Sequence, residues 1–174
     1  MCAGCEALGR HRLFYLLCVE PSVRGLRARL QGASVLHFGP EPSLQRALAR
    51  LAGRYYTADA QPGAAALTLD MTAIALPSEC FDVVIANHVL EHIQDDLSAI
   101  REMHRMLRPG GIAIVSVPLC TGPTYENPAL TDPRERQRLF EEQTHVGPWG
   151  DDHIQRLLEA SRCASCRLTI LARN

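Results

Sequence analysis

The 174-residue chain contains no lysine, so arginine supplies all 18 of its basic Lys and Arg residues. The net charge is only −1, which argues against a broad basic face for nucleic acid. No apolar run approaches the roughly 18 uninterrupted residues that predict a membrane-spanning helix. The first residues carry Glu6, Arg10 and Arg12 with no following cleavage site, so no signal peptide is predicted. We therefore expect a cytoplasmic protein with neither a nucleic-acid nor a membrane partner.

Hydrophobic residues make up 47% of the chain, which suits one domain with its own core. Its seven cysteines are, in the cytoplasm, expected to be reduced thiols or metal ligands rather than disulfides. Cys18 and Cys80 resemble small buried hydrophobic residues. Two Cys-x-x-Cys pairs stand near opposite ends of the chain and are the lesser candidates for a zinc site, namely Cys2, Cys5, Cys163 and Cys166. Because the pairs are so far apart, we expect no bound zinc.

The stretch from Phe81 to Pro118 carries the clearest pattern in the chain. Residues 83–86 form a short, β-branched apolar run, which is typical of a strand buried on both faces of a parallel sheet. A polar cluster follows directly, made of Asn87, His88, Glu91 and His92. Ligands of open α/β sheets bind outside the carboxyl ends of the strands, so this cluster is a candidate site.

A helix and a second strand are predicted after the polar cluster. Apolar residues recur at helical spacing from Leu97 to Leu107, and Pro109-Gly110-Gly111 predicts the end of that helix. Residues 112–117 predict another buried strand. The remaining expected helices are Leu8–Val19, with Leu13, Leu16 and Leu17 on one face, and Val23–Leu30, Ser43–Leu51 and Asp151–Ser161. The remaining expected strands are Ala33–Phe38, Arg54–Asp59, Leu67–Asp70 and Cys166–Ala172.

Two runs, D-V-V-I-A-N-H-V-L-E-H-I and L-R-P-G-G, occur in the order and at the separation found in class I S-adenosylmethionine-dependent methyltransferases. The chain closely resembles that family, in particular its type 11-like members. The resemblance implies an α/β fold, with a doubly wound, mostly parallel sheet and helices on both faces. It also implies transfer of a methyl group from S-adenosylmethionine to a small-molecule acceptor by in-line displacement, with S-adenosylhomocysteine as product.

The resemblance also divides the chain. Residues 33–174 would form the S-adenosylmethionine-binding domain, and residues 1–32 an N-terminal helical segment with the remnant of a zinc ribbon. The family's sheet ends in a hairpin, but only residues 166–174 follow the last predicted helix. We therefore expect a shortened C-terminal hairpin whose exposed edge favours a homodimer.

Cofactor-binding residues are implied at the end of each early strand. The loop after the first strand runs His37, Phe38, Gly39, Pro40, Glu41, where the family usually shows an acid and two glycines. Asp59 would bind the ribose, Asp70 the adenine amino group, and Met71 would pack on the ring. Asn87 and His88 would contact the methionine part. The alternatives are a turn that has lost the cofactor, a surface Asp59 and a capping Asp70 beside a core methionine.

A general base is needed only where the acceptor arrives protonated, and histidine suits neutral pH. The candidates are His88, His92 and His145, and no spacing chooses among them. The segment after the fifth strand resembles a family block at which acceptor pockets are built, with Tyr125, Glu126, Arg134, Arg138 and Trp149 as pocket candidates. The chief alternative is a catalytically inactive methyltransferase-like binding or interaction protein. A zinc-dependent nucleic-acid adaptor is poorly supported by the charge.

Overall fold

The computed structural model describes residues 9–18, 26–119, 123–124, 132, 134–135, 138, 149–161 and 167–173. Its centre is a six-stranded sheet in the order β3-β2-β1-β4-β5-β6, and neighbouring strands are parallel throughout. The strands are β1 (Ser34–Phe38), β2 (Arg54–Asp59), β3 (Leu67–Thr68), β4 (Phe81–Asn87), β5 (Leu107–Pro118) and β6 (Arg167–Arg173). The strand order reverses between β1 and β4, which makes their carboxyl ends the topological switch point.

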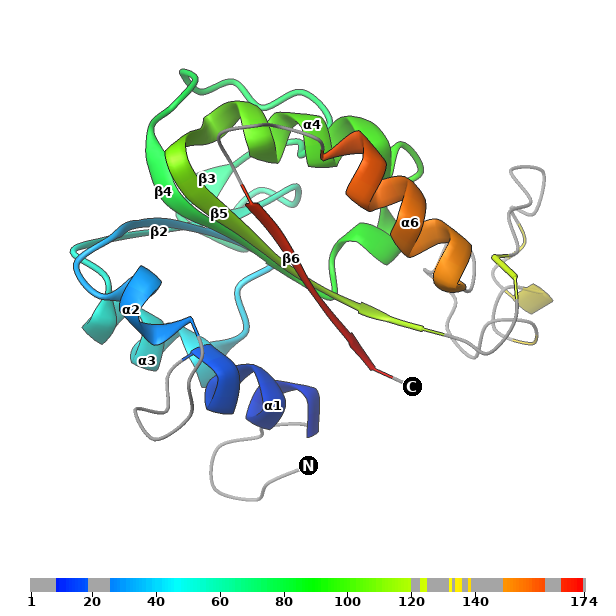
Figure 1. The fold of residues 1–174 in the computed structure, drawn as a ribbon, viewed down its shortest axis with the longest axis horizontal. Coiled ribbons are helices and arrows are strands. Elements are labelled where there is room, and N and C mark those ends of the chain that lie inside the picture. Colours follow the sequence, from blue (N-terminus) through cyan, green and yellow to red (C-terminus); the bar gives the residue numbers. More distant parts are fainter. Residues whose placement is uncertain are drawn as a thin grey trace.

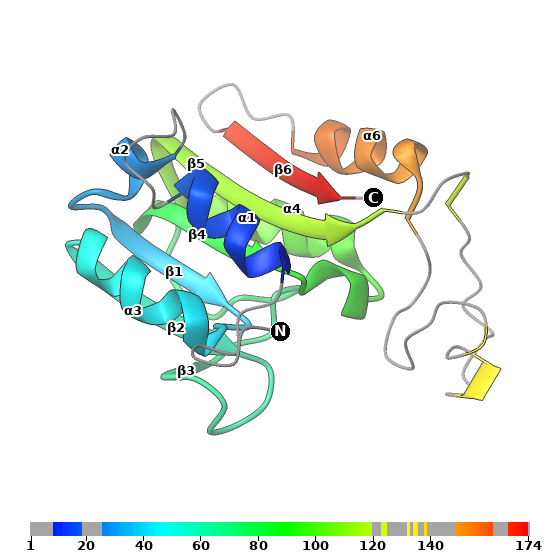
Figure 2. The same cartoon turned by 90° about the horizontal axis from the view of Figure 1, so that it is seen from below.

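Helices cover both faces of the sheet, as Figures 1 and 2 show. One face carries α1 (Gly9–Cys18), α2 (Arg27–Leu30) and α3 (Pro42–Leu51). The other carries α4 (Asp96–Met106) and α6 (Asp151–Ala160), and the short 3-10 helix η1 (Leu90–His92) follows β4. The predicted doubly wound α/β fold is confirmed. No helix of the described chain combines the length and apolarity needed to cross a bilayer.

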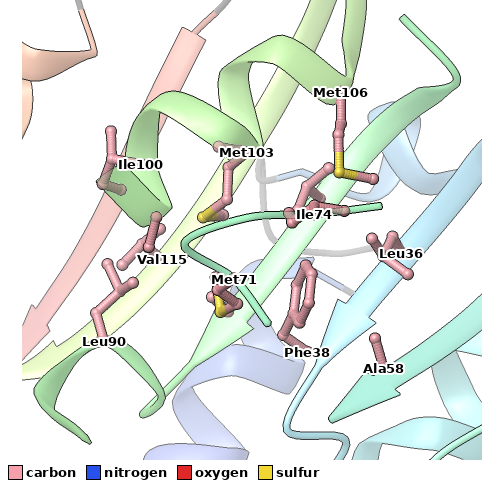
Figure 3. Close-up of a cluster of buried hydrophobic side chains, with 14 of the residues drawn as sticks. Leu36, Phe38, Ala58, Met71, Ile74, Leu90, Ile100, Met103, Met106 and Val115 are labelled. Carbon is pink, nitrogen blue, oxygen red and sulfur yellow. The ribbon is translucent and has the colours of Figure 1, made fainter. Parts of the chain in front are cut away.

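Side chains of the central strands alternate between two hydrophobic cores. Leu36 and Phe38 of β1 enter the core under α4, whereas Val35 enters the core under α1, α2 and α3. Figure 3 shows the first of these cores, to which α4 contributes Ile100 and Met103 and the strand and loop side contributes Phe38 and Met71. This alternation fixes which way each residue at a strand end points.

The structure corrects three details of the expected elements. In α1 the buried residues are His11, Phe14 and Cys18. Leu17 is partly buried against the same core, whereas Leu16 is 47% exposed, so the leucine face holds for Leu17 and is wrong for Leu16. Pro109-Gly110-Gly111 lies inside β5, where the pairing with β4 shifts register between Phe81 and Val83. Cys80 is half-buried, and its thiol donates to the Pro77 carbonyl at 3.0 Å.

Strand β6 ends the sheet next to β5. It pairs with β5 from Ile112 and Arg167 to Pro118 and Arg173, so the closing strand predicted over Cys166–Ala172 is confirmed. The helix predicted over Val23–Leu30 is present as the shorter α2, and residues 19–25 lie outside the described chain. The homodimer expected from the sheet edge stays a prediction.

Candidate active site

A cavity of about 330 Å³ opens at the carboxyl ends of β1, β2 and β4. Parallel strands deliver their following loops to the same edge of the sheet, so residues far apart in sequence meet there. The described residues that line it are Phe38, Gly39, Asp59, Ala60, Gln61, Leu69, Asp70, Met71, His88, Val89, His92 and Ile93. Five of the residues predicted to bind cofactor are among them: Gly39, Asp59, Asp70, Met71 and His88.

Gly39 forms the tight turn after β1. Its φ of +56° lies in the left-handed region, and its amide donates to the Ala58 carbonyl at 3.0 Å. A Cβ atom at this position would lie 2.7 Å from Cγ2 of Val89, closer than such contacts normally allow. Only glycine fits this turn without strain, because any side chain here would overlap Val89.

Two carboxylates border the cavity on the β2 and β3 side. Asp59 ends β2, and its Oδ1 accepts from the Gln61 amide at 2.8 Å. Asp70 accepts from the amide and the hydroxyl of Thr72, and the amide bond first, then the hydroxyl bond, lower the pKa of Asp70. Met71 is 4% exposed and packs against Phe38 in the core (Figure 3). Asp70 is therefore a turn-capping residue that also lines the cavity.

Three further predicted cofactor residues lie behind the cavity, on the α1 and α3 side, namely His37, Glu41 and Asn87. His37 is fully buried, with Nε2 3.2 Å from Oε2 of Glu41 and Nδ1 2.8 Å from the Tyr55 hydroxyl. Asn87 donates through Nδ2 to Oε1 of Glu41. Burial, and then the negative charge of Glu41, raise the pKa of Tyr55. His11 of α1 adds a contact to Glu41 at 3.8 Å, so one carboxylate gathers polar groups from several elements.

The buried polar cluster accounts for the histidine at position 37, where the family usually shows an acid. His37 contacts Glu41 and the Tyr55 hydroxyl there. Strand alternation turns His37 away from the face of Phe38, and Pro40 lies in the loop without lining the cavity. Asn87 is 2% exposed, and its Oδ1 accepts no hydrogen bond from any described residue. A buried amide oxygen without a donor is costly, so the cluster can still accept a donor group.

Beside the cavity, His88 and Glu91 form a pair. His88 has a φ of +55°, and its amide donates to the Ser116 carbonyl at 2.8 Å. Its Nδ1 lies 3.0 Å from Oε1 of Glu91, which is almost fully buried. A non-glycine residue in this backbone region is strained, and such strain gathers at functional sites. His92 also lines the cavity.

The predicted acceptor-pocket residues fall elsewhere or outside the described chain. Trp149 is buried and stacks on His153 at a ring distance of 4.2 Å, away from the cavity wall. Arg134 and Arg138 are exposed and do not line the cavity. The predicted residues that lie outside the described chain are Tyr125, Glu126, His145, Cys2, Cys5, Cys163 and Cys166. Among the described residues, no three His, Cys, Asp or Glu side chains are grouped so as to hold a metal ion.

Sequence reasoning did not identify His11 and Tyr55 as partners of the site. The sequence contains a spacing pattern at each of these residues. His11 precedes the buried Phe14 by three residues, and Tyr55 alternates with the exposed Tyr56 along β2. Neither pattern identifies a partner without the tertiary contacts.

Residues 36–115 match the family model Methyltransf_11, described as a methyltransferase domain. A ubiquinone biosynthesis O-methyltransferase of Ruegeria pomeroyi is 48% identical over 44 residues, covering 25% of this chain and 18% of that protein. A probable S-adenosylmethionine-dependent methyltransferase of Mycolicibacterium smegmatis is 34% identical over 71 residues, covering 41% of this chain and 25% of that protein. The chain thus spans a quarter or less of the length of these relatives.

Solved structures share the fold at low identity. A putative methyltransferase of Bacillus halodurans has a TM-score of 0.58 at 17% identity, covering 78% of this chain and 67% of that one. The 1,6-didemethyltoxoflavin-N1-methyltransferase of Burkholderia thailandensis has a TM-score of 0.54 at 20% identity, covering 88% of this chain and 70% of that one. The chain therefore has the Rossmann-like methyltransferase fold, and its residues 36–115 match the methyltransferase-domain family.

Proposed function

We propose that this protein binds S-adenosylmethionine in the cavity at the β1 and β4 ends and transfers its methyl group to a small-molecule acceptor. The observation that carries the proposal is the cavity itself, which joins the tight Gly39 turn to the acid that ends β2. Its volume of about 330 Å³ falls within the size range of small-molecule sites. In this proposal residues 33–174 form the cofactor-binding domain.

The nucleoside half of the cofactor fits the β2 and β3 side of the cavity. An acid at the end of β2 accepts hydrogen bonds from ribose hydroxyls in dinucleotide folds, and Asp59 stands there with one oxygen already engaged by Gln61. Asp70 supplies an acceptor for an adenine amino group, and Met71 an apolar surface for the ring.

The amino-acid half would lie toward the buried polar cluster, whose residues stand behind the cavity and do not line it. The ammonium group of the methionine part needs acceptors and a negative charge. Oδ1 of Asn87 is a buried acceptor without a donor among the described residues, and Glu41 supplies a carboxylate bonded to the same amide. Glu41 would thus take the role of the acid that His37 replaces in the first-strand motif.

When bound, the cofactor supplies an electrophilic methyl group. The protein contributes alignment of the acceptor with that methyl group and exclusion of water. His88 and His92 are the titratable side chains of the β4 end that border the cavity. The Burkholderia thailandensis structure contains a small molecule together with S-adenosylhomocysteine, and this relative supports a small-molecule acceptor for the present chain.

A methyltransferase-like binding protein without catalysis is the second candidate, favoured by Pro40 and Glu41 in a loop that is usually glycine-rich. Incubation with S-adenosylmethionine and pools of small molecules separates the two. Formation of S-adenosylhomocysteine that depends on an added acceptor, and that the Asp59→Ala variant loses, would support the enzyme. Cofactor binding without turnover on any pool would favour the binding protein.

A further inference from the structure

We infer that Tyr55 is a positioning residue that acts through His37 and Glu41 to make the site selective for ligands with an ammonium group. The inference rests on the proposed binding of S-adenosylmethionine. It goes beyond that proposal because it gives ligand selectivity to a tyrosine of β2 that does not itself line the cavity.

The hydroxyl of Tyr55 donates a hydrogen bond to the ring of His37. Burial, and then the negative charge of Glu41, raise the pKa of Tyr55, so the hydroxyl keeps its proton. It lies 2.8 Å from Nδ1 of His37, whose Nε2 lies 3.2 Å from Oε2 of Glu41. A bare nitrogen so close to a carboxylate oxygen would be repelled, so the neutral ring carries its proton on Nε2. Nδ1 is then an acceptor, and the Tyr55 hydroxyl supplies its donor.

This hydrogen bond holds the His37 ring against Glu41. His37 is fully buried, so without the Tyr55 hydroxyl its Nδ1 would be a buried acceptor that lacks a donor. Such an atom costs free energy, which a turn of the ring or a change of tautomer would lower. Either change would weaken the contact between Nε2 and the Glu41 carboxylate. Tyr55 therefore influences Glu41 through the ring of His37.

Glu41 in turn fixes the amide of Asn87. Because a carboxylate accepts and cannot donate, the contact requires Nδ2 of Asn87 to face Oε1 of Glu41. Oδ1 of Asn87 consequently faces away from that oxygen. Asn87 is 2% exposed, and neither its Oδ1 nor Oε2 of Glu41 accepts a hydrogen bond from a described residue. The cluster thus presents two buried acceptors, one of them on a carboxylate, that still need donors.

An ammonium group is the part of the proposed ligand that suits these acceptors. It brings several N–H donors and a positive charge, and hydrogen bonds between charged groups are stronger than neutral ones. Gly39 lines the cavity two residues before Glu41. His88 lines it directly after Asn87, so both acceptors belong to residues close in sequence to the cavity wall.

The carboxylate of the ligand has no comparable partner on the described wall of the cavity. That wall contains two aspartates, Asp59 and Asp70, and no arginine. A carboxylate therefore meets no guanidinium there, which is the side chain best suited to bind it. We expect the ammonium group to contribute more to affinity than the carboxylate does.

Calorimetric titration with two ligands tests the selectivity. One ligand is S-adenosylhomocysteine, and the other is its deaminated analogue, in which hydrogen replaces the amino group. We expect the wild type to bind the deaminated analogue about tenfold more weakly, and the decarboxylated analogue, which keeps the ammonium group, to lose less. Tyr55→Phe should weaken S-adenosylhomocysteine binding about fivefold and leave the deaminated analogue unchanged. The matched control is Tyr56→Phe, because this neighbouring tyrosine of β2 is 41% exposed, and it should change neither affinity.

The comparison of ligands separates positioning from a merely structural role, since it forms a double-mutant cycle between Tyr55 and the ammonium group. No loss of affinity in Tyr55→Phe, or an equal loss for both ligands, overturns the inference. Equal affinity of the wild type for both ligands also overturns it, because an ordered water would then satisfy the two acceptors. Wild-type protein that binds none of these ligands would instead remove the proposed function.

Nuclear magnetic resonance tests the relay without any ligand. In long-range proton–nitrogen spectra of labelled protein, with His37 assigned through His37→Gln, we expect a neutral ring that carries its proton on Nε2. In Tyr55→Phe the same ring should show a larger share of the other tautomer, whereas Tyr56→Phe should leave the spectrum of His37 unchanged. A wild-type ring protonated on Nδ1 overturns the inference, since Tyr55 would then not be the donor.

Discussion

Replacing Gly39 with alanine tests the tight turn on which the cavity depends. The new Cβ would lie 2.7 Å from Cγ2 of Val89, in a backbone with φ of +56°. The left-handed conformation costs an L-residue about 1–2 kcal/mol, and overpacking of this kind costs about 1–3 kcal/mol more. Val89 gives way only with difficulty because its branched side chain has few χ1 rotamers.

Urea unfolding followed by circular dichroism measures this cost through the midpoint at constant m-value. We expect Gly39→Ala to lower the free energy of unfolding by about 2–5 kcal/mol. The matched control is Gly63→Ala, where φ is +82° but no atom lies within 4 Å of the new Cβ. That variant should lose only the backbone cost of about 1–2 kcal/mol.

A double-mutant cycle with Val89→Ala isolates the contact itself. Removal of Cγ2 should relieve the clash, so Gly39→Ala should cost no more in that background than Gly63→Ala costs in the wild type. The reasoning fails if Gly39→Ala is no more destabilising than Gly63→Ala in the wild-type background, or if Val89→Ala leaves its cost unchanged. Both glycine variants are then titrated with S-adenosylhomocysteine, and only Gly39→Ala should bind more weakly.

Three further changes have defined outcomes. Asp59→Ala should weaken S-adenosylmethionine binding by about 1–3 kcal/mol through lost hydrogen bonds, and unchanged affinity in calorimetry would refute its ribose role. Arg105 donates to the carbonyls of Ile74 and Leu76, so Arg105→Ala should speed amide exchange over residues 74–78, whereas the exposed Arg101→Ala should not. His104 is buried and both its ring nitrogens lack partners among the described residues, and burial lowers the pKa of His104. The unfolded state therefore binds the proton more readily, and stability falls as the pH drops through about 6.5. His104→Leu should reduce that loss between pH 8 and pH 5.5 in urea unfolding, and an identical loss in both proteins would contradict the assignment.

The sheet could be predicted because its central strands are buried on both faces. Residues 83–86 and 112–117 are apolar throughout, and such runs have few other uses in an α/β chain. The acids after the strands were predicted on other grounds: Asp59 from its distance beyond Gly39 and from the family resemblance, and Asp70 from the resemblance alone. Asp59 and Asp70 both line one cavity.

Tertiary contacts decided the features that the sequence could not predict. The leucine pattern of α1 gave no indication of His11, which that helix turns toward Ser43 and Glu41. His37 and Glu41 were predicted in one group with Gly39, yet they contact each other behind the cavity that Gly39 lines. The spacing of three residues could suggest that His88 contacts Glu91, but the burial of Glu91 is visible only in the fold.

The central claim is that the cavity between Gly39, Asp59 and Asp70 holds S-adenosylmethionine. Isothermal titration of the purified protein with S-adenosylmethionine and S-adenosylhomocysteine tests it most directly. We predict one site per chain with micromolar Kd for both ligands, and markedly weaker binding in Asp59→Ala. Absence of heat and of competition for either ligand, with cooperatively folded protein, would contradict the claim.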